Sequence, residues 1–294
     1  MKRTVKTVLA ASAVAASLVL PASGASAQGS GPTLYGLTTT NRIVTVNTAF
    51  SVFSTNDVAV TGLAAGEQLI GIDRRPNGGV IYGVARAANG TGRLLTVDPT
   101  TGISTPVAPL VAAPVGMTPR GGPITLSGTE FGFDFNPMAD ALRIVSDTGQ
   151  NLRVIPSNRA PANLPALVTG DTFTDTPLNA DVNPATGVIA AAYTNNIAAA
   201  PSTVLYDIDT RRDVLVKQIP PNAGTLVTVG SLRFPVGSVA GFDIVTTNGV
   251  DAGYAALTIA GRPFTYLANV DLTTGRATIT GIAAYPRTLK GLTA

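Results

Sequence analysis

The sequence predicts an all-β protein, a five-bladed β-propeller, and three observations lead to that class. A short apolar pattern that contains one Asp recurs along the chain, as is typical of a repeat architecture. The 294 residues include 31 Gly and 21 Pro, which suits many short strands joined by turns. After residue 27 no stretch keeps a 3.6-residue apolar period, so we expect almost no helix. We interpret the copies as the innermost strands of successive blades: Gly71-Ile72-Asp73, Gly132-Phe133-Asp134, Ala180-Asp181-Val182 and Gly241-Phe242-Asp243.

The first 27 residues have the pattern of an export signal. Three basic residues precede an apolar run over 8–20, and the small residues Ala25-Ser26-Ala27 follow it. The run is shorter than the ~20 apolar residues that a membrane-spanning helix needs, so we expect cleavage near Ala27. No Cys follows the run, which excludes a bacterial-type lipid anchor. Residues 28–294 are then expected to form a single propeller domain that is secreted or periplasmic.

Charge and composition exclude several classes of function. The chain has 20 basic and 17 acidic residues, but three of the basic ones lie in residues 1–27, so the remainder is balanced. No cluster of Lys and Arg is larger than a pair, so we expect no nucleic-acid partner. The chain contains neither His nor Cys, which excludes Ser-His-Asp and Cys-His catalysis, His-ligated metals and disulfides. No second apolar segment could span a membrane, and we expect a monomer.

Four antiparallel strands are expected in each blade, in chain order. The first blade takes strands from 34–38, 42–46 and 52–60, and its inner strand is missing from this part of the chain. The expected strands of the second to fifth blades are 69–73, 80–85, 93–98 and 103–110; 130–136, 141–146, 151–155 and 167–173; 178–182, 188–193, 203–209 and 225–229; and 239–245, 253–257, 264–271 and 277–282. Near copies at Val97-Asp98-Pro99-Thr100-Thr101-Gly102 and Val270-Asp271-Leu272-Thr273-Thr274-Gly275 support this register.

The last residues supply the strand that the first blade lacks. Leu289-Lys290-Gly291-Leu292-Thr293 repeats the pattern of Leu69-Ile70-Gly71-Ile72-Asp73, with Thr293 in the place of the Asp. A C-terminal inner strand would close the ring and leave no unpaired blade edge. Six blades remain an alternative if the segment 220–238 contains further strands.

One Asp stands near the end of each expected inner strand, at Asp73, Asp134, Asp181 and Asp243. If the register holds, these side chains converge on the propeller axis, where clustered carboxylates repel unless they are protonated or bind a cation. A divalent cation such as calcium suits such oxygen ligands, and the sequence indicates no other cofactor. Asn136 and Asn183, two residues further on, face the same way and could add oxygens. The alternative is that these Asp and Asn residues only fix the turns at the strand ends.

Two expected inserts, at 156–166 and 211–224, would overhang the side where the Asp residues lie. Arg153, Arg211 and Arg212 would then be close enough to pair with the carboxylates or with an anionic ligand. The alternative is that the inserts merely vary in length.

The chain resembles a known family through several motifs taken together. They are Gly132-Phe133-Asp134-Phe135-Asn136-Pro137, Asp140-Ala141-Leu142-Arg143-Ile144-Val145-Ser146, Asn151-Leu152-Arg153, Pro220-Pro221-Asn222-Ala223-Gly224-Thr225-Leu226 and Gly241-Phe242-Asp243-Ile244. On these residues the chain is similar to the bacterial domain of unknown function 4394 family, over nearly the whole length after residue 34. The resemblance implies an exported, propeller-like protein and assigns no catalytic residue.

Two functions from different classes follow. The first is an exported propeller that binds an extracytoplasmic ligand or protein, or serves as a scaffold outside the cytoplasm. The second is an enzyme, a divalent-cation-dependent lyase or a lactone or glycan hydrolase, that uses the Asp-lined axis. The sequence alone leaves open whether the protein is an enzyme, and it names no substrate. Metal analysis and thermal melting with and without a chelator separate the two, because a protein with no bound ion and an unchanged melt would exclude the enzyme.

Overall fold

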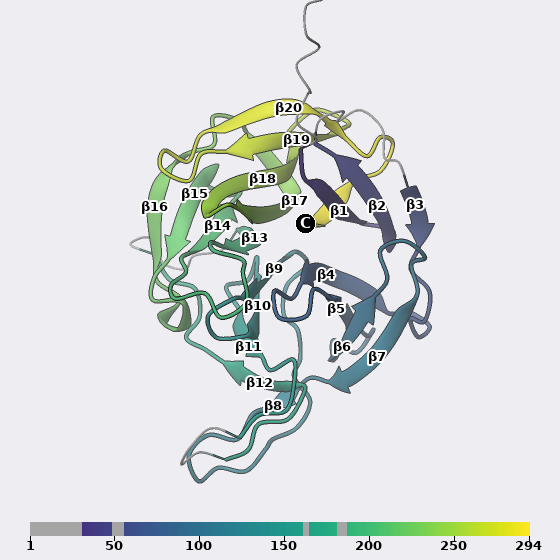
Figure 1. The fold of residues 1–294 in the computed structure, drawn as a ribbon, viewed down its shortest axis with the longest axis vertical. Helices are drawn as coiled ribbons and strands as arrows, with labels where there is room; N and C mark the ends of the chain where they lie inside the picture. The colour runs from purple at the N-terminus through teal and green to yellow at the C-terminus, as the bar shows by residue number, and fades with distance from the viewer. Residues whose placement is uncertain (1–30, 49–55, 161–164, 181–186) are drawn as a thin grey trace, which may run out of the picture.

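The computed structural model describes residues 31–48, 56–160, 165–180 and 187–294, which form a five-bladed β-propeller (Figure 1). Each blade is built from antiparallel strands, and the innermost strands surround one axis. This confirms the predicted fold class with five blades rather than six. The expected export signal lies outside the described residues.

The first blade is closed by the last strand of the chain. Its strands, from the axis outward, are β21 (Leu289–Thr293), β1 (Thr33–Thr38), β2 (Arg42–Asn47) and β3 (Asn56–Ala59). Strand β21 pairs antiparallel with β1, with Thr293 opposite Tyr35, and Figure 1 shows the C-terminus beside β1 at the centre of the ring. The predicted closure by residues 289–293 is therefore confirmed.

The second and fifth blades follow the expected register. Their strands are β4 (Gln68–Arg74), β5 (Ile81–Arg86), β6 (Gly92–Val97) and β7 (Ser104–Pro109), and β17 (Val236–Thr247), β18 (Val250–Ile259), β19 (Thr265–Val270) and β20 (Ala277–Ala283). The two near-identical turns work in the same way: Asp98 accepts the backbone N–H of Thr100 at 2.8 Å, and Asp271 accepts that of Thr273 at 2.8 Å. Gly102 stands after the first of these turns with a φ of +74°, a conformation that other residues rarely adopt.

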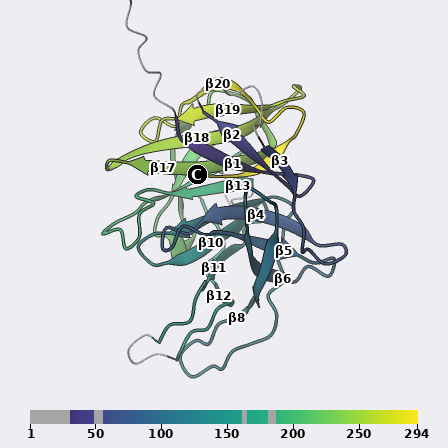
Figure 2. The ribbon, with the colours of Figure 1, turned by 45° about the vertical axis from the view of Figure 1, so that its right-hand side comes forward.

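The third blade has one strand more than expected. It contains β9 (Phe131–Asn136), β10 (Ala141–Ser146), β11 (Asn151–Val154) and β12 (Asp171–Thr174). A short strand from the preceding connection, β8 (Val111–Ala112), adds to β12 in parallel at the outer edge. Figure 2 shows the long loops of this region extending from the body of the propeller beyond β8 and β12.

The fourth blade corrects the predicted register. Its strands are β13 (Val188–Tyr193), β14 (Leu205–Asp209), β15 (Val214–Gln218) and β16 (Leu226–Ser231), with a 3₁₀ turn η1 (Pro221–Ala223) between the last two. The innermost strand of this blade is β13 rather than the predicted 178–182, of which residues 181 and 182 lie outside the described residues. The prediction of an insert at 211–224 was wrong, because it contains β15. Asp181 and Asn183 lie outside the described residues.

The inner strands need Gly because neighbouring blades approach closely at the axis. A Cβ atom on Gly71 would lie 2.5 Å from the Cβ of Phe133, and one on Gly132 would lie 2.8 Å from the carbonyl carbon of Ala190. A Cβ on Gly241 would meet the backbone of Gly291 at 2.7 Å. In the recurring pattern, the Gly therefore permits the close contact with the next blade, the apolar residue packs in the core, and the Asp lies near the end of the strand.

Helix is almost absent, as expected: in the described ranges, η1 is the one helical element. No helix formed by these residues has the length and apolar character that crossing a membrane requires.

Candidate functional site

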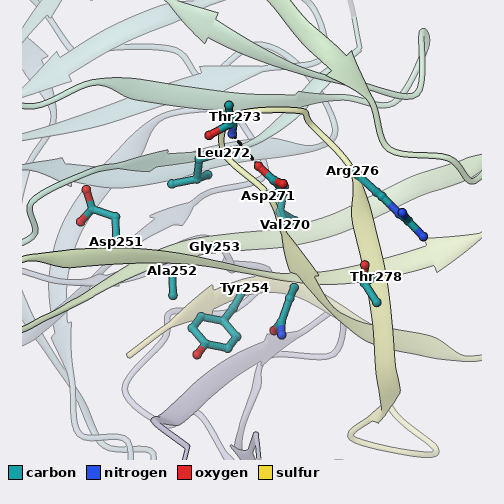
Figure 3. Close-up of a pocket in the computed structure, with 11 residues that line it drawn as sticks. Asp251, Ala252, Gly253, Tyr254, Val270, Asp271, Leu272, Thr273, Arg276 and Thr278 are labelled. Atoms are coloured by element: carbon teal, nitrogen blue, oxygen red, sulfur yellow. Dashed lines mark hydrogen bonds between the residues drawn. The ribbon is translucent and has the colours of Figure 1, made fainter.

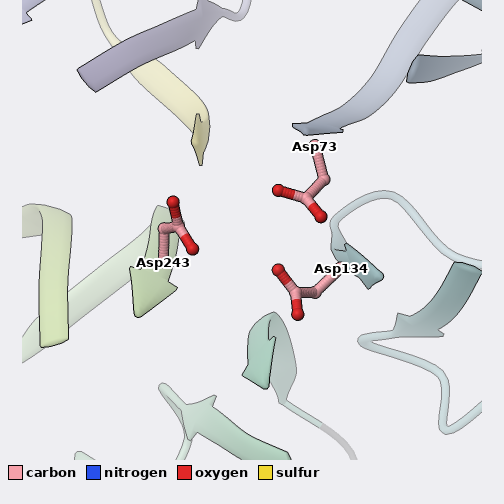
Figure 4. A group of neighbouring side chains, drawn as sticks. All are labelled: Asp73, Asp134 and Asp243. Atoms are coloured by element: carbon pink, nitrogen blue, oxygen red, sulfur yellow. The ribbon is translucent and has the colours of Figure 1, made fainter. Parts of the chain in front are cut away.

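Three carboxylates converge at one end of the propeller axis. Asp73 from β4, Asp134 from β9 and Asp243 from β17 each offer one oxygen, and these three oxygens lie within 4.8 Å of one another. Figure 4 shows the side chains facing a common space from three different blades. Each residue is at most 5% exposed. The structure thus brings together three of the four Asp residues singled out in the sequence, and we call them the carboxylate cluster.

Each acid of the cluster is held by the next blade around the ring. Asp73 accepts the backbone N–H of Phe135 at 2.8 Å, and Asp134 accepts that of Tyr193 at 2.7 Å. Asp243 accepts the backbone N–H of Ala294 at 2.7 Å. Each donor residue comes directly after the residue of its own inner strand that corresponds to the Asp of the recurring pattern. The cluster therefore connects neighbouring blades through hydrogen bonds to its carboxylate oxygens.

Two of the five positions in this ring are not acidic. Thr293 occupies the position in the first blade, where its hydroxyl accepts the Arg74 backbone N–H at 3.0 Å and donates to Asp73 at 2.8 Å. In the fourth blade Ala192 occupies this position, because it directly precedes Tyr193, whose backbone N–H bonds Asp134. Sequence reasoning missed Ala192, and the only signal for it was the fully apolar run that now forms β13.

Burial raises the pKa of all three acids, and the charges of neighbouring carboxylates add to the rise for Asp73 and Asp134. Burial is the main cause for Asp73, whose pKa rises to about 8 with a further contribution from the charge of Asp243. The pKa of Asp134 is raised well above its usual range by burial and by the charges of Asp73 and Asp243. The pKa of Asp243 rises to about 6, mainly through burial, while two backbone N–H groups and the charge of Arg74 oppose the rise. Near neutral pH the cluster therefore retains protons unless a cation replaces them.

A cavity of about 180 Å³ opens onto the carboxylate cluster. Asp73, Asp134, Thr293, Arg74, Arg75 and Asn196 line it. Further along the axis the free space shrinks to about 10 Å³ between Phe133, Phe242, Leu292 and the inner-strand glycines, room for roughly one water. The cavity therefore narrows almost completely at its inner end, where apolar side chains close it. We call this cavity the mouth.

Two arginines are fixed on the wall of this mouth. Arg74 donates to the carbonyl oxygens of Ala294 and Gly79, and its guanidinium lies 5.6 Å above the ring centre of Tyr35. Arg75 forms an ion pair with Asp140 and donates to Ser157 at 2.9 Å. Two guanidinium groups therefore lie on the wall of the cavity near the buried acids, although neither forms a described ion pair with the carboxylate cluster.

Asn136 and Arg153 lie near the predicted place but are engaged elsewhere. The Asn136 side chain accepts the backbone N–H groups of Met138 and Ala139 at 3.0 and 2.9 Å, so it caps the turn that ends β9. Arg153 pairs with Asp175 at 3.1 Å, and its guanidinium lies 4.4 Å from the ring centre of Phe173. Their roles in ligand binding stay predictions. The insert after β11 does reach the mouth, since Ser157 bonds Arg75 there.

Arg211 and Arg212 stand at the other end of the blade. They lie in the turn after β14, and β14 runs from Leu205, opposite Tyr193, to Asp209, opposite Val188. The turn is therefore remote from Tyr193, whose backbone bonds the carboxylate cluster. Arg212 pairs with Asp209 at 2.6 Å. The structure does not bring these two arginines to the cluster, so a ligand role for them would need a separate site.

A second polar group lies buried between the third and fourth blades. Arg143, only 2% exposed, donates to Asn151, Asp175 and Asn222, at 2.7 Å in each case, and to the Tyr193 hydroxyl at 3.4 Å. We call this the Arg143 network. Three of its members belong to motifs singled out in the sequence, but their meeting could not be foreseen because they come from distant parts of the chain.

The largest of the described pockets lies on the fifth blade, with a volume of about 540 Å³. Tyr254, Asn269 and Thr278 stand in one row across β18, β19 and β20 along this pocket, which Figure 3 shows from the side. The two acids at its edge already accept hydrogen bonds: Asp251 from Thr246 and Asp271 from Thr273. The pocket has no converging charges comparable with those of the carboxylate cluster.

Comparison with known proteins gives a family. The sequence profile of a family described as "Domain of unknown function (DUF4394)" matches residues 51–293. No curated protein matches the chain. The crystal structure of a nidogen/laminin complex is similar at 12% identity and a TM-score of 0.47, over 90% of this chain and 98% of that one. That of AofleA from Arthrobotrys oligospora is similar at 12% identity and a TM-score of 0.41, over 89% and 71%. Likenesses this distant carry no argument about function.

Proposed function

We propose that this protein is an exported propeller that binds a ligand through a divalent cation at its carboxylate cluster. The chain belongs to the DUF4394 family, a family of domains of unknown function. The observation that carries this proposal is the convergence of three buried acids that form no described ion pair, two of which, Asp73 and Asp134, line a cavity of about 180 Å³. The bonds that join the blades use one oxygen of Asp134 and one of Asp243, and both oxygens of Asp73. The repulsion among the three carboxylates is then left for a cation to relieve.

The donor set suits a hard cation such as calcium. Calcium takes 6–8 oxygen ligands, of which the three acids would supply the charged share. The cavity of about 180 Å³ has room for several waters at ~30 Å³ each. Such waters can be replaced by hydroxyl or carboxylate oxygens of a ligand. Arg74, which forms no described ion pair, lines the cavity and favours a ligand whose oxygen-rich end enters it.

Export fits this proposal. Residues 1–27 combine a basic start, an apolar run and a small-residue site near Ala27, and removal there would leave 28–294 as the working protein. Calcium sites of extracellular modules bind at roughly 10⁻⁴–10⁻³ M, an affinity that three acids with few other fixed ligands can provide.

A second candidate is a cation-dependent lyase or hydrolase at the same mouth. The observation that favours it is the pKa of Asp73, which rises to about 8 and so keeps an acid ready to exchange a proton near neutral pH. Turnover of an uncharged lactone or a glycan that stops on chelation would support this candidate. Binding of the same compound without turnover would favour the binding module.

Metal analysis and thermal melting with calcium or with a chelator test the cation directly. We expect about one calcium per chain and a melting temperature that rises with calcium and falls with EGTA. Asp134→Asn should abolish both responses. The matched control is Asp98→Asn, which changes an exposed turn-capping acid and should leave the calcium response intact. A wild-type protein that binds no calcium and melts identically in EGTA would refute the proposal.

A further inference from the structure

The opposite end of the axis carries positive charge. There a pocket of about 290 Å³ is lined by Gln68, Ile70, Arg86, Thr129, Phe131 and Lys290. Lys290 stands three residues before Thr293 in β21 and occupies the same strand position as Ile70 and Phe131, which precede Asp73 and Asp134 by the same spacing. An inner-strand position that is apolar in β4 and β9 is thus filled by a lysine in β21.

The Lys290 amine is partly buried without a contacting partner. Within the described ranges it has no ion pair at 4 Å or closer. Its pKa is lowered chiefly by burial, against the attraction of the more distant Glu130. Burial also raises the pKa of Glu130, which weakens that acid as a counter-charge. A buried ammonium in this state gains stability from any anion that contacts it.

Arg86 adds a second cation to the same pocket. It is half-buried and donates one guanidinium N–H to the Gly128 carbonyl oxygen at 2.8 Å, which fixes it on the wall. A guanidinium has five N–H donors, so most of them stay available for a planar acidic group. Gln68 contributes a neutral donor beside it, while the Thr129 hydroxyl already donates to Asp147 at 2.6 Å.

We propose that this pocket is a second binding site, for a small anionic ligand whose carboxylate or phosphate group is held between Lys290 and Arg86. The volume of about 290 Å³ corresponds to the lower end of ligand pockets, so the ligand is a small molecule rather than a polymer. A narrow space of about 10 Å³, lined by apolar residues and glycines and, on the side of this site, by Lys290, lies between this site and the carboxylate cluster. The inference therefore does not rest on the proposed cation site.

Titration calorimetry with inorganic phosphate and, separately, with succinate tests the site. Both probes are used at fixed pH and constant ionic strength, so that a general salt effect is excluded. We expect at least one of them to bind, and Lys290→Met and Arg86→Gln each to weaken that binding by about tenfold or more. A response to phosphate alone or to succinate alone supports the site and identifies which acidic group it prefers.

Two controls separate this site from other effects. Lys217→Met removes a lysine that lies over the Tyr206 ring in the fourth blade, and it should leave anion binding unchanged. Asp134→Asn should remove the calcium response but not anion binding, so the two proposals fail independently. The inference is overturned if the wild type binds neither probe, if Lys290→Met and Arg86→Gln bind as the wild type does, or if Lys217→Met weakens binding equally. Thermal melting confirms that each variant is folded.

Discussion

The Arg143 network and the carboxylate cluster are both buried and polar, and they meet at one point: Arg143 on β10 stands directly opposite Asp134 on β9. Arg143 is paired with Asp175 and bonded to two asparagine oxygens. The carboxylate cluster instead gathers three acids with no base in contact. Burial alone therefore does not reveal a functional site. The difference lies in pairing, since the network is complete in itself while the cluster requires protons or a cation.

The largest expected effect is on the paired region. Arg143→Met should lower the free energy of unfolding by about 3–5 kcal/mol, because it removes the buried cation that bonds Asp175, Asn222 and the buried Asn151 and leaves Asp175 with only the more exposed Arg153. Arg153→Met is the matched control: it pairs with the same Asp175 but is 28% exposed, so its loss should be about 0–1 kcal/mol. Urea unfolding measures both. Equal losses in the two variants would show that the network is not the stabilising element we describe.

The unpaired region should make the chelated protein less stable as pH rises. An acid with a raised pKa binds its proton more tightly in the folded chain, so the proton stabilises the fold below about pH 4. That stabilisation is lost as pH rises through about 6 for Asp243 and about 8 for Asp73. Paired acids behave oppositely: the pKa of Glu67 is lowered, mainly by Arg93, so its contribution is lost only as pH falls below the usual range.

Thermal melting in EGTA across pH 5–9 measures this dependence, and calcium should flatten it by replacing the protons. A melting temperature that is independent of pH over this range in EGTA would contradict the raised pKa values of these buried acids.

A smaller effect is expected at the hydroxyl of the ring. Thr293→Val removes the acceptor of the Arg74 N–H and a donor to Asp73, at a cost of about 1–2 kcal/mol. Because that donor stabilises the charged form of Asp73, its loss should also move the alkaline destabilisation to higher pH. Thr258→Val, which removes only a bond to the Val239 carbonyl, should cost a similar amount without moving the midpoint. If the pH midpoint of the destabilisation moves in Thr258→Val, or does not move in Thr293→Val, then Thr293 does not act on the pKa of Asp73.

The smallest effect concerns Asp207, a fully buried acid near Arg143 that has no described hydrogen bond. Burial raises its pKa well above the usual range, although the charge of Arg143 opposes this. Asp207→Asn should change stability by less than about 1 kcal/mol at pH 5 and increase it at pH 9. Asp209→Asn, which breaks the pair with Arg212, should instead be destabilising at both pH values. If Asp207→Asn destabilises at pH 9, Asp207 is charged and belongs to the paired network.

The two regions also differ in how far sequence could predict them. Strand ends, Gly positions and the repeat of Leu289–Thr293 are local signals, and they sufficed for the five blades, the closure and three acids of the cluster. The fourth blade failed because Ala190 and Ala192 replace the Gly and Asp of the pattern, while Asp181 imitates it. The Arg143 network joins the hairpin of β10 and β11 to Asp175, Tyr193 and Asn222, and the packing of one blade on the next sets the distances to Tyr193 and Asn222.

Proton release on calcium binding tests the central claim most directly. Calorimetric titration of calcium near pH 7, in two buffers of different ionisation enthalpy, gives both the stoichiometry and the number of protons displaced. We predict one calcium per chain, with protons released from the carboxylate cluster, and neither binding nor release in Asp134→Asn. No binding by the wild type, or binding with release that Asp134→Asn leaves unchanged, would contradict the account.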